Sequence, residues 1–232
     1  LGNLFSGSIG AIHLVLGNYQ VTAVCIIISL ILDFLDGFVA RALKSNSNLG
    51  AQLDSLADMV SFGLIPGIAM YKMLEPFGSD FLGMNLPFEL KYLGLFITLF
   101  SCLRLAIFNL DDEQTYYFKG LNTPSNTILI FGILYLVKIG VDYSKNQLGG
   151  LAFRFDFGVE FYLILTVISS WLLISPIKMI AMKFKSKKLQ DNYPKIALLI
   201  GAVLILIIFG IVGIPLVIVY YILISLIFQK QL

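Results

Sequence analysis

Residues 33–58 read DFLDGFVARALKSNSNLGAQLDSLAD, and they set four aspartates into sequence that is otherwise apolar and helical in pattern. The spacing is D-x2-D-G-x2-A-R-x8-G-x3-D-x3-D, with its fixed positions at Asp33, Asp36, Gly37, Ala40, Arg41, Gly50, Asp54 and Asp58. A carboxylate among apolar membrane helices is energetically expensive, so such a residue indicates a functional site. Four converging carboxylates repel one another unless cations lie between them. The stretch therefore predicts a metal site.

The composition around this stretch is that of an integral membrane protein. Of 232 residues, 58% are hydrophobic and 13% are charged, and the mean hydropathy is +0.90. Soluble domains carry about 25% charged residues. The formal net charge of +2 gives no argument for nucleic acid as a partner. Cys25 and Cys102 both lie in apolar runs, so no disulfide is expected. The sequence opens with LGNLFSG, without an initiator Met and without a recognisable cleavable signal peptide.

Hydrophobic runs long enough to cross a bilayer predict about eight helices, because a spanning helix needs about 20 mostly apolar residues. The predicted spans are residues 3–16, 19–44, 50–75, 89–109, 124–141, 157–182, 195–210 and 213–230. The predicted fold class is an all-α polytopic membrane protein. Residues 1–182 are expected to form its transmembrane core and residues 183–232 a C-terminal helical hairpin. Residues 77–88 are expected to form a loop, and residues 142–156 fit either a short strand or an interfacial segment.

The basic residues indicate how the chain is oriented, because Lys and Arg concentrate on the cytoplasmic side of a membrane. If the loop at residues 45–49 is cytoplasmic, that side carries ten of the 16 Lys and Arg, the opposite side carries five, and Arg104 lies inside a span. This split predicts a multi-pass protein of the cell (inner) membrane whose acidic motif faces the cytoplasm. The basic run at residues 183–188 fits a topology signal or an attraction for anionic lipid headgroups.

The spacing also places the acids on two facing stripes, because residues three and four apart share one face of a helix. One stripe holds Asp33, Asp36, Gly37 and Ala40, and the other holds Gly50, Asp54, Ala57, Asp58 and Ser61. The two helices are expected to form a hairpin with its apex near residues 45–47. Asp33 and Asp58 are symmetric about this apex, as are Asp36 and Asp54. All four carboxylates are therefore expected to face one volume.

The residue types favour phosphoryl-group chemistry on hard metal ions. Carboxylate oxygens without His or Cys suit Mg²⁺, Mn²⁺ or Ca²⁺ rather than Zn²⁺. Gly37, Ala40 and Gly50 leave space for a ligand beside the acids, and Arg41 can bind phosphate through two hydrogen bonds. Metals that face a phosphate neutralise developing charge and orient an in-line displacement.

The acidic cluster also has other interpretations. A single intramembrane Asp fits a structural contact or a proton relay, and an ion transporter is the alternative from a different class. Transporters often contain inverted repeats, and no repeat is visible in this sequence. A transporter would also leave Gly37, Ala40 and Arg41 unexplained. His13, the sole histidine, is expected to have a hydrogen-bonded structural role.

The eight-residue pattern resembles, at every fixed position, the signature of the CDP-alcohol phosphatidyltransferase family. Three further segments resemble the phosphatidylserine synthase branch of that family: SFGLIPGIAMY at 61–71, RLAIFN at 104–109 and FKGLNTP at 118–124. Ile107 replaces the second Arg that is usual in this branch, and Asn122 replaces the usual Pro. The resemblance covers residues 1–135, and the C-terminal helices are generic.

This resemblance implies a six-helix core that is extended by further helices and packs as a homodimer. It also implies that the nucleotide and the metals occupy a polar cavity open to the cytoplasm. It implies Asp33, Asp36 and Asp54 as metal ligands, and Asp58 as a ligand that is also the general base. The residues implied to contact CDP-diacylglycerol are Asn3, Gly37, Ala40, Arg41 and Ser47.

The reaction implied by the resemblance joins CDP-diacylglycerol and L-serine into phosphatidylserine and CMP, with Mg²⁺ or Mn²⁺ as cofactor. Candidate residues for binding serine or phosphate are Arg104, Asn109, Lys119 and Thr123. Arg104 also fits a packing partner for an aspartate, and Lys119 also fits a solvated loop charge. The alternative within the family is another acceptor alcohol, glycerol 3-phosphate or inositol phosphate. Phosphorylated acceptors need more basic residues than the membrane-embedded Arg41 and Arg104, which favours serine.

Overall fold

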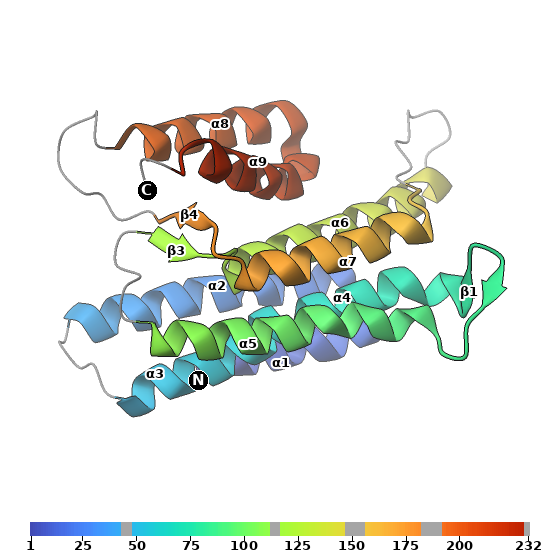
Figure 1. Ribbon diagram of the computed structural model, residues 1–232, viewed down its shortest axis with the longest axis horizontal. Coiled ribbons are helices and arrows are strands. Elements are labelled where there is room, and N and C mark those ends of the chain that lie inside the picture. Colours follow the sequence, from blue (N-terminus) through green and yellow to red (C-terminus); the bar gives the residue numbers. More distant parts are fainter. Residues whose placement is uncertain (43–47, 112–116, 147–155, 182–191, 230–232) are drawn as a thin grey trace. The chain divides into compact units, whose positions relative to one another are not determined.

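The computed structural model describes residues 1–42, 48–111, 117–146, 156–181 and 192–229. The chain divides into two compact units, Leu1–Leu110 with Phe157–Ser170, and Asp111–Asp156 with Trp171–Leu232. Both units are built mainly of helices, which confirms the prediction of an all-α polytopic membrane protein (Figure 1). The predicted domain boundary at residues 182–183 lies outside the described residues.

Four helical stretches of the described chain are long and apolar enough to cross a membrane: Tyr19–Val39, Asn48–Phe77, Leu90–Leu110 and Tyr193–Ile227. A shorter apolar helix covers Val159–Ile174. The last long stretch contains two of the predicted spans, which the structure separates by a turn at Gly210–Val212. Six of the eight predicted spans agree with the observed helices within three residues at both ends.

The first unit contains the acidic motif. Its elements are α1 (Gly2–Val15), α2 (Tyr19–Ala42), α3 (Asn48–Asp58), a π-helix (Met59–Leu64), α4 (Ile65–Leu74), a 3-10 turn (Glu75–Phe77), the short strands β1 (Asp80–Phe81) and β2 (Met84–Asn85), a 3-10 helix (Leu90–Leu95), α5 (Phe96–Leu110) and most of α7 (Val159–Ile174). α3, the π-helix and α4 follow one another without a break, so Asp54 and Asp58 belong to one long membrane helix. The predicted loop at 77–88 contains the antiparallel pair β1–β2.

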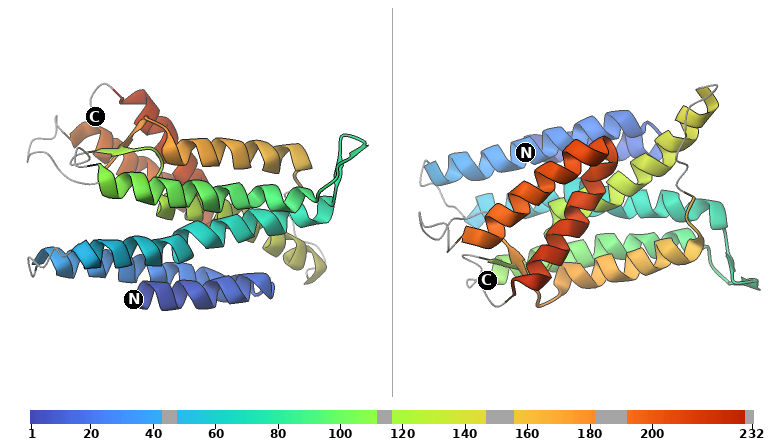
Figure 2. Two further views of the ribbon diagram at one scale, coloured as in Figure 1. Left: turned by 60° about the horizontal axis from the view of Figure 1, so that its bottom comes forward. Right: turned by 90° about the horizontal axis from the view of Figure 1, so that it is seen from above.

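α1 packs closely on α2 and on the π-helix (Figure 2). A side chain on Gly7 would collide with the Ser61 hydroxyl, so only glycine allows α1 to approach this far. Ser6 Oγ donates a hydrogen bond to the Cys25 carbonyl at 2.9 Å, and Thr22 Oγ1 donates one to the Gly10 carbonyl at 3.1 Å. Small residues and interhelical hydrogen bonds are the usual means of packing helices in membranes, where neighbouring lipid is as apolar as the helices. These contacts hold α1 beside the helices that carry the acids.

The second unit combines helices with a two-stranded sheet. Its elements are β3 (Tyr117–Lys119), α6 (Thr123–Asn146), the end of α7, β4 (Lys178–Ile180), α8 (Tyr193–Phe209), a 3-10 turn (Gly210–Val212) and α9 (Gly213–Ile227). β3 pairs with β4 in antiparallel register, Tyr117 opposite Ile180. α8 and α9 lie against each other as a hairpin (Figure 1 and Figure 2). A buried cluster links these elements through Leu121, Leu129, Leu172, Met179, Ile180, Leu198, Ile218, Tyr221 and Ile224.

Two predicted spans were wrong in length. The span 157–182 was predicted as one helix, but α7 ends at Ile174 and β4 follows it. The reason is Pro176, because the ring of proline disfavours helical geometry in the preceding residue. The span 124–141 continues in the structure to Asn146. Residues 142–146, which were expected to form a strand or an interfacial segment, are therefore the end of α6.

Candidate active site

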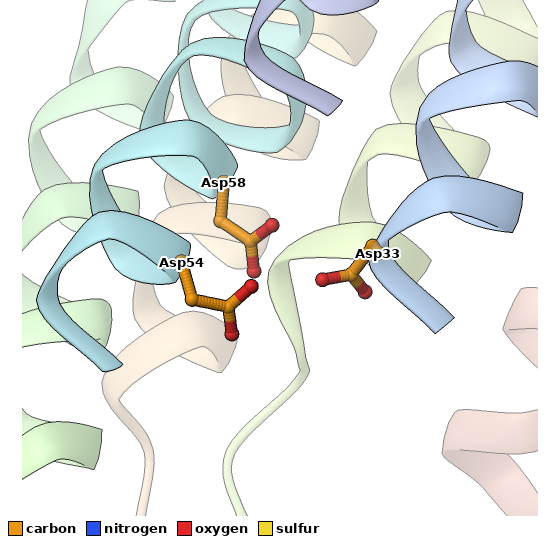
Figure 3. A group of neighbouring side chains, drawn as sticks. All are labelled: Asp33, Asp54 and Asp58. Carbon is orange, nitrogen blue, oxygen red and sulfur yellow. The ribbon is translucent and has the colours of Figure 1, made fainter. Parts of the chain in front are cut away.

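Three of the four predicted acids converge. Asp33, Asp54 and Asp58 each offer a carboxylate oxygen, and these oxygens lie within 4.8 Å of one another. Figure 3 shows Asp33 on α2 facing Asp54 and Asp58, which project from successive turns of α3. Asp54 is exposed, and Asp33 and Asp58 are half-buried. The convergence from two helices is the arrangement that the hairpin symmetry predicts.

Asp36 lies outside this trio. It follows Asp33 by three residues on α2, and its carboxylate lies 3.9 Å from the Leu1 nitrogen with more than half of the side chain exposed. The role of Asp36 as a fourth ligand therefore stays a prediction.

Asn3 contributes a contact that the sequence did not predict. Its side-chain Nδ2 donates a hydrogen bond to Asp58 Oδ1 at 2.9 Å. The residue was expected to approach a nucleotide, which stays a prediction, and its amide group contacts one of the acids. Asn3 is 1% exposed, and its Oδ1 has no hydrogen-bond partner among the described residues.

The trio has the donor set of a divalent-cation site. Three carboxylates supply hard oxygen ligands of the kind that Mg²⁺ and Mn²⁺ prefer. The buried Oδ1 of Asn3 needs a donor, and water bound to a cation beside Asp58 would supply one. The residues therefore fit a hydrated divalent cation.

Of the remaining residues predicted to contact CDP-diacylglycerol, the structure fully describes one. Gly37 follows Asp33 by one helical turn on α2. The side chains of Ala40 and Arg41, and Ser47 as a whole, lie outside the part of the chain that the structure describes. The nucleotide pocket therefore stays a prediction.

α5 brings further polar groups to the acidic helix. Asn109 Nδ2 donates to Ser55 Oγ at 2.9 Å, and Ser55 Oγ lies 3.1 Å from Asn109 Oδ1. Ser55 directly follows Asp54, so Asn109 is attached to α3 at the level of the trio. Arg104 is 6% exposed, and its guanidinium carbon lies 5.8 Å from the centre of the Phe108 ring. Ser55 had no sequence signal of its own, because serine is common in membrane helices.

Lys119 and Thr123 belong to the second unit. Lys119 lies in β3, where its Nζ contacts Asp111 Oδ2 at 2.8 Å, so it is part of a strand and an ion pair rather than a loop charge. Thr123 begins α6 and is 1% exposed, and its carbonyl accepts a hydrogen bond from Thr127 Oγ1. Their contact with substrate stays a prediction. His13, expected to be structural, lies 3.3 Å from Asn18 Nδ2 through its Nδ1.

Comparison with known proteins adds an independent finding. The family model described as CDP-alcohol phosphatidyltransferase matches residues 2–172, which contain the whole acidic motif. The chain belongs to the CDP-alcohol phosphatidyltransferase family. The expectation from the resemblance is thereby confirmed at the level of the family.

Relatives within the family point to one activity. The chain is 34% identical over 151 residues to the CDP-diacylglycerol–serine O-phosphatidyltransferase of Saccharomyces cerevisiae, covering 61% of this chain and 50% of that protein. It is 36% identical over 119 residues to the enzyme of the same name from Helicobacter pylori, covering 49% and 46%. It is 31% identical over 124 residues to that of Bacillus subtilis, covering 53% and 66%. The matches thus span from about half to two thirds of the relatives' length.

Proposed function

We propose that this protein is a membrane-embedded phosphatidyltransferase that makes phosphatidylserine and CMP from CDP-diacylglycerol and L-serine. The observation that carries the proposal is the convergence of Asp33, Asp54 and Asp58 from two membrane helices in a chain of this family. Serine as the acceptor is supported by the names of the similar proteins. A cell (inner) membrane location, a cytoplasm-facing site and a homodimer are part of the same proposal.

In this function, Asp33, Asp54 and Asp58, with Asp36 beside them, would hold the divalent cation. When bound, a cation supplies positive charge that offsets the negative charge of a pyrophosphate and its leaving group. Asp58 accepts the proton of the serine hydroxyl. The serine oxygen then bonds to the phosphorus that carries diacylglycerol, and the bond from that phosphorus to the CMP oxygen breaks. A general base of this kind contributes about 10²–10⁴-fold to a rate.

The acceptor pocket is proposed to lie beside α5. Arg104 supplies a cation for the carboxylate of serine or for a substrate phosphate, and a guanidinium binds either group through two hydrogen bonds. Asn109, held by Ser55, supplies amide groups next to Asp54. Gly37, Ala40, Arg41 and Ser47 are proposed to line the nucleotide side, and contact of Lys119 and Thr123 with substrate stays a prediction from the sequence.

The test is substrate-dependent release of CMP by the purified protein in lipid nanodiscs. CDP-diacylglycerol is supplied with L-serine, glycerol 3-phosphate or inositol phosphate, each with Mg²⁺ or Mn²⁺. Of the three alcohols, we expect only L-serine to give CMP and a lipid product, phosphatidylserine, and we expect the Asp58→Asn variant to release CMP about 10²–10⁴-fold more slowly. Release of CMP with only a phosphorylated alcohol would refute serine as the acceptor. Cation flux in proteoliposomes without any lipid product would refute the enzyme function.

A further inference from the structure

Asn3 is joined to Asp58 by a hydrogen bond whose direction is fixed by chemistry. An ionised carboxylate only accepts hydrogen bonds, so the amide group that faces it must be the Nδ2 donor. The donor lies 2.9 Å from Asp58 Oδ1, inside a site where Asn3 is almost fully buried. One carboxylate oxygen of Asp58 is thereby held by α1. Such a bond restricts the rotation of the carboxylate.

The backbone of Asn3 is fixed as well. Its carbonyl accepts hydrogen bonds from Ser61 Oγ at 3.0 Å and from Ser29 Oγ at 3.3 Å. Both serines are fully buried. Ser61 lies in the π-helix, and Gly7 leaves the space that its hydroxyl needs. Asn3 is therefore the centre of a buried polar network that joins α1, α2 and the π-helix.

The two serines stand next to the acids in the sequence of their helices. Ser29 precedes Asp33 by four residues on α2, and Ser61 follows Asp58 by three. Residues at these separations lie one helical turn apart. Asn3 is thus bonded to Ser29, one turn from Asp33, and to Ser61, one turn from Asp58. It is also bonded to Asp58 itself. This is a means of holding the two acid-bearing helices in register.

We infer that Asn3 is a positioning residue, whose amide orients Asp58 and whose carbonyl holds α2 and the π-helix so that the three carboxylates stay together. The inference extends the proposed function, since it takes Asp58 as the base and the trio as the cation site. Hydrogen-bond partners of metal ligands orient those ligands, and their removal typically lowers metal affinity or activity about 10–100-fold. The Nδ2 bond to Asp58 distinguishes this role from a direct contact with nucleotide.

The experiment compares Asn3→Ala with the wild type in nanodiscs, with Ser8→Ala as the matched control. Ser8 lies on the same helix and donates only to the Leu4 carbonyl, away from the acids. Binding of Mn²⁺ without substrate is measured by electron paramagnetic resonance, and kcat and KM are measured from CMP release. For Asn3→Ala we expect at least about a tenfold loss of Mn²⁺ affinity and a matching fall in kcat, with KM for CDP-diacylglycerol nearly unchanged. Ser8→Ala should match the wild type in all three.

Wild-type Mn²⁺ affinity in Asn3→Ala, with a raised KM for CDP-diacylglycerol, would overturn the inference and assign Asn3 to the nucleotide. If Asn3→Ala does not fold, the double variant Ser29→Ala with Ser61→Ala decides. It retains the amide but loosens its backbone, so weakened Mn²⁺ binding supports the inference and unchanged binding overturns it. A wild type that binds Mn²⁺ but releases no CMP with serine refutes the proposed function, while the Mn²⁺ comparison still decides the role of Asn3.

Discussion

The hairpin of α2 and α3 and the hairpin of α8 and α9 are both made of membrane-crossing sequence, yet they use their polar groups in opposite ways. In α8 and α9, Tyr220 Oη donates a hydrogen bond to the Ala197 carbonyl at 2.9 Å, and Tyr221 Oη donates one to the Ile180 carbonyl at 3.1 Å. In α2 and α3 three carboxylates face one another, and the buried Oδ1 of Asn3 on α1 has no hydrogen-bond partner among the described residues. A membrane helix that carries mutually repelling acids is destabilised unless a ligand compensates. This difference is the reason for proposing the chemistry in the first hairpin.

Removing divalent cations should therefore abolish the activity that is proposed for the hairpin of α2 and α3. In excess EDTA we expect the release of CMP from CDP-diacylglycerol and serine to stop. The site would then lack the positive charge of the cation, which offsets the negative charge of the pyrophosphate. Adding Mg²⁺ or Mn²⁺ beyond the chelator should restore it. Turnover that persists in the chelator would contradict the claim that the acids of the first hairpin hold a cation that the reaction needs.

Asp58→Asn tests the proposed base within that hairpin. The amide keeps the shape of the side chain but cannot accept the serine proton, so kcat should fall by about 10²–10⁴-fold. The rate of CMP release under saturating serine measures this. The matched control is Asp80→Asn, since Asp80 lies in β1, where its Oδ1 accepts a hydrogen bond from the Gly83 backbone N–H at 3.0 Å. Equal loss in both variants would point to a general effect on the fold.

Arg104→Ala tests whether the substrate site includes Arg104 of α5. A hydrogen bond to a charged group contributes about 1.5–3 kcal/mol, so KM for serine, or for CDP-diacylglycerol if the guanidinium binds phosphate, should rise about 10–100-fold. Saturation curves for both substrates tell the two roles apart. Unchanged curves for both substrates would exclude Arg104 from the substrate site.

Tyr220→Phe tests the hairpin of α8 and α9 and should have the smallest effect of these variants on activity and stability. It removes the hydroxyl bond to Ala197 between α8 and α9, which corresponds to about 0.5–1.5 kcal/mol of unfolding free energy. We expect a slightly lower midpoint of thermal unfolding and unchanged kcat and KM. A large loss of activity at unchanged thermal stability would show that the C-terminal hairpin takes part in the chemistry.

The acidic trio could be predicted because it depends on local rules. The i, i+4 spacing of Asp54 and Asp58 sets their common face, and a short connection to α2 makes the two helices neighbours. The predicted pairing of Asp36 with Asp54 was less secure, because it depends on how far each helix is rotated about its axis. In the structure Asp33 is the residue of α2 whose carboxylate oxygen lies within 4.8 Å of carboxylate oxygens of both Asp54 and Asp58.

Contacts distant in sequence could not be predicted in this way. Asn3 and Asp58 are 55 residues apart, and their bond requires both the close approach of α1 at Gly7 and the π-helix that follows Asp58. The sequence MVSFGL gives no local signal for a π-helix. The end of α7 at Ile174 could have been predicted from the sequence, because Pro176 follows it closely. The prediction missed it because the apolar run continues beyond Pro176.

The most direct test of the central claim is Mn²⁺ binding by the wild type and by Asp33→Asn, Asp54→Asn and Asp58→Asn, measured by electron paramagnetic resonance without substrate. If these three carboxylates share one cation site, each variant should lose affinity by at least about tenfold, and Asp80→Asn should bind as the wild type does. Wild-type affinity in any of the three variants, or no binding by the wild type, would contradict the account.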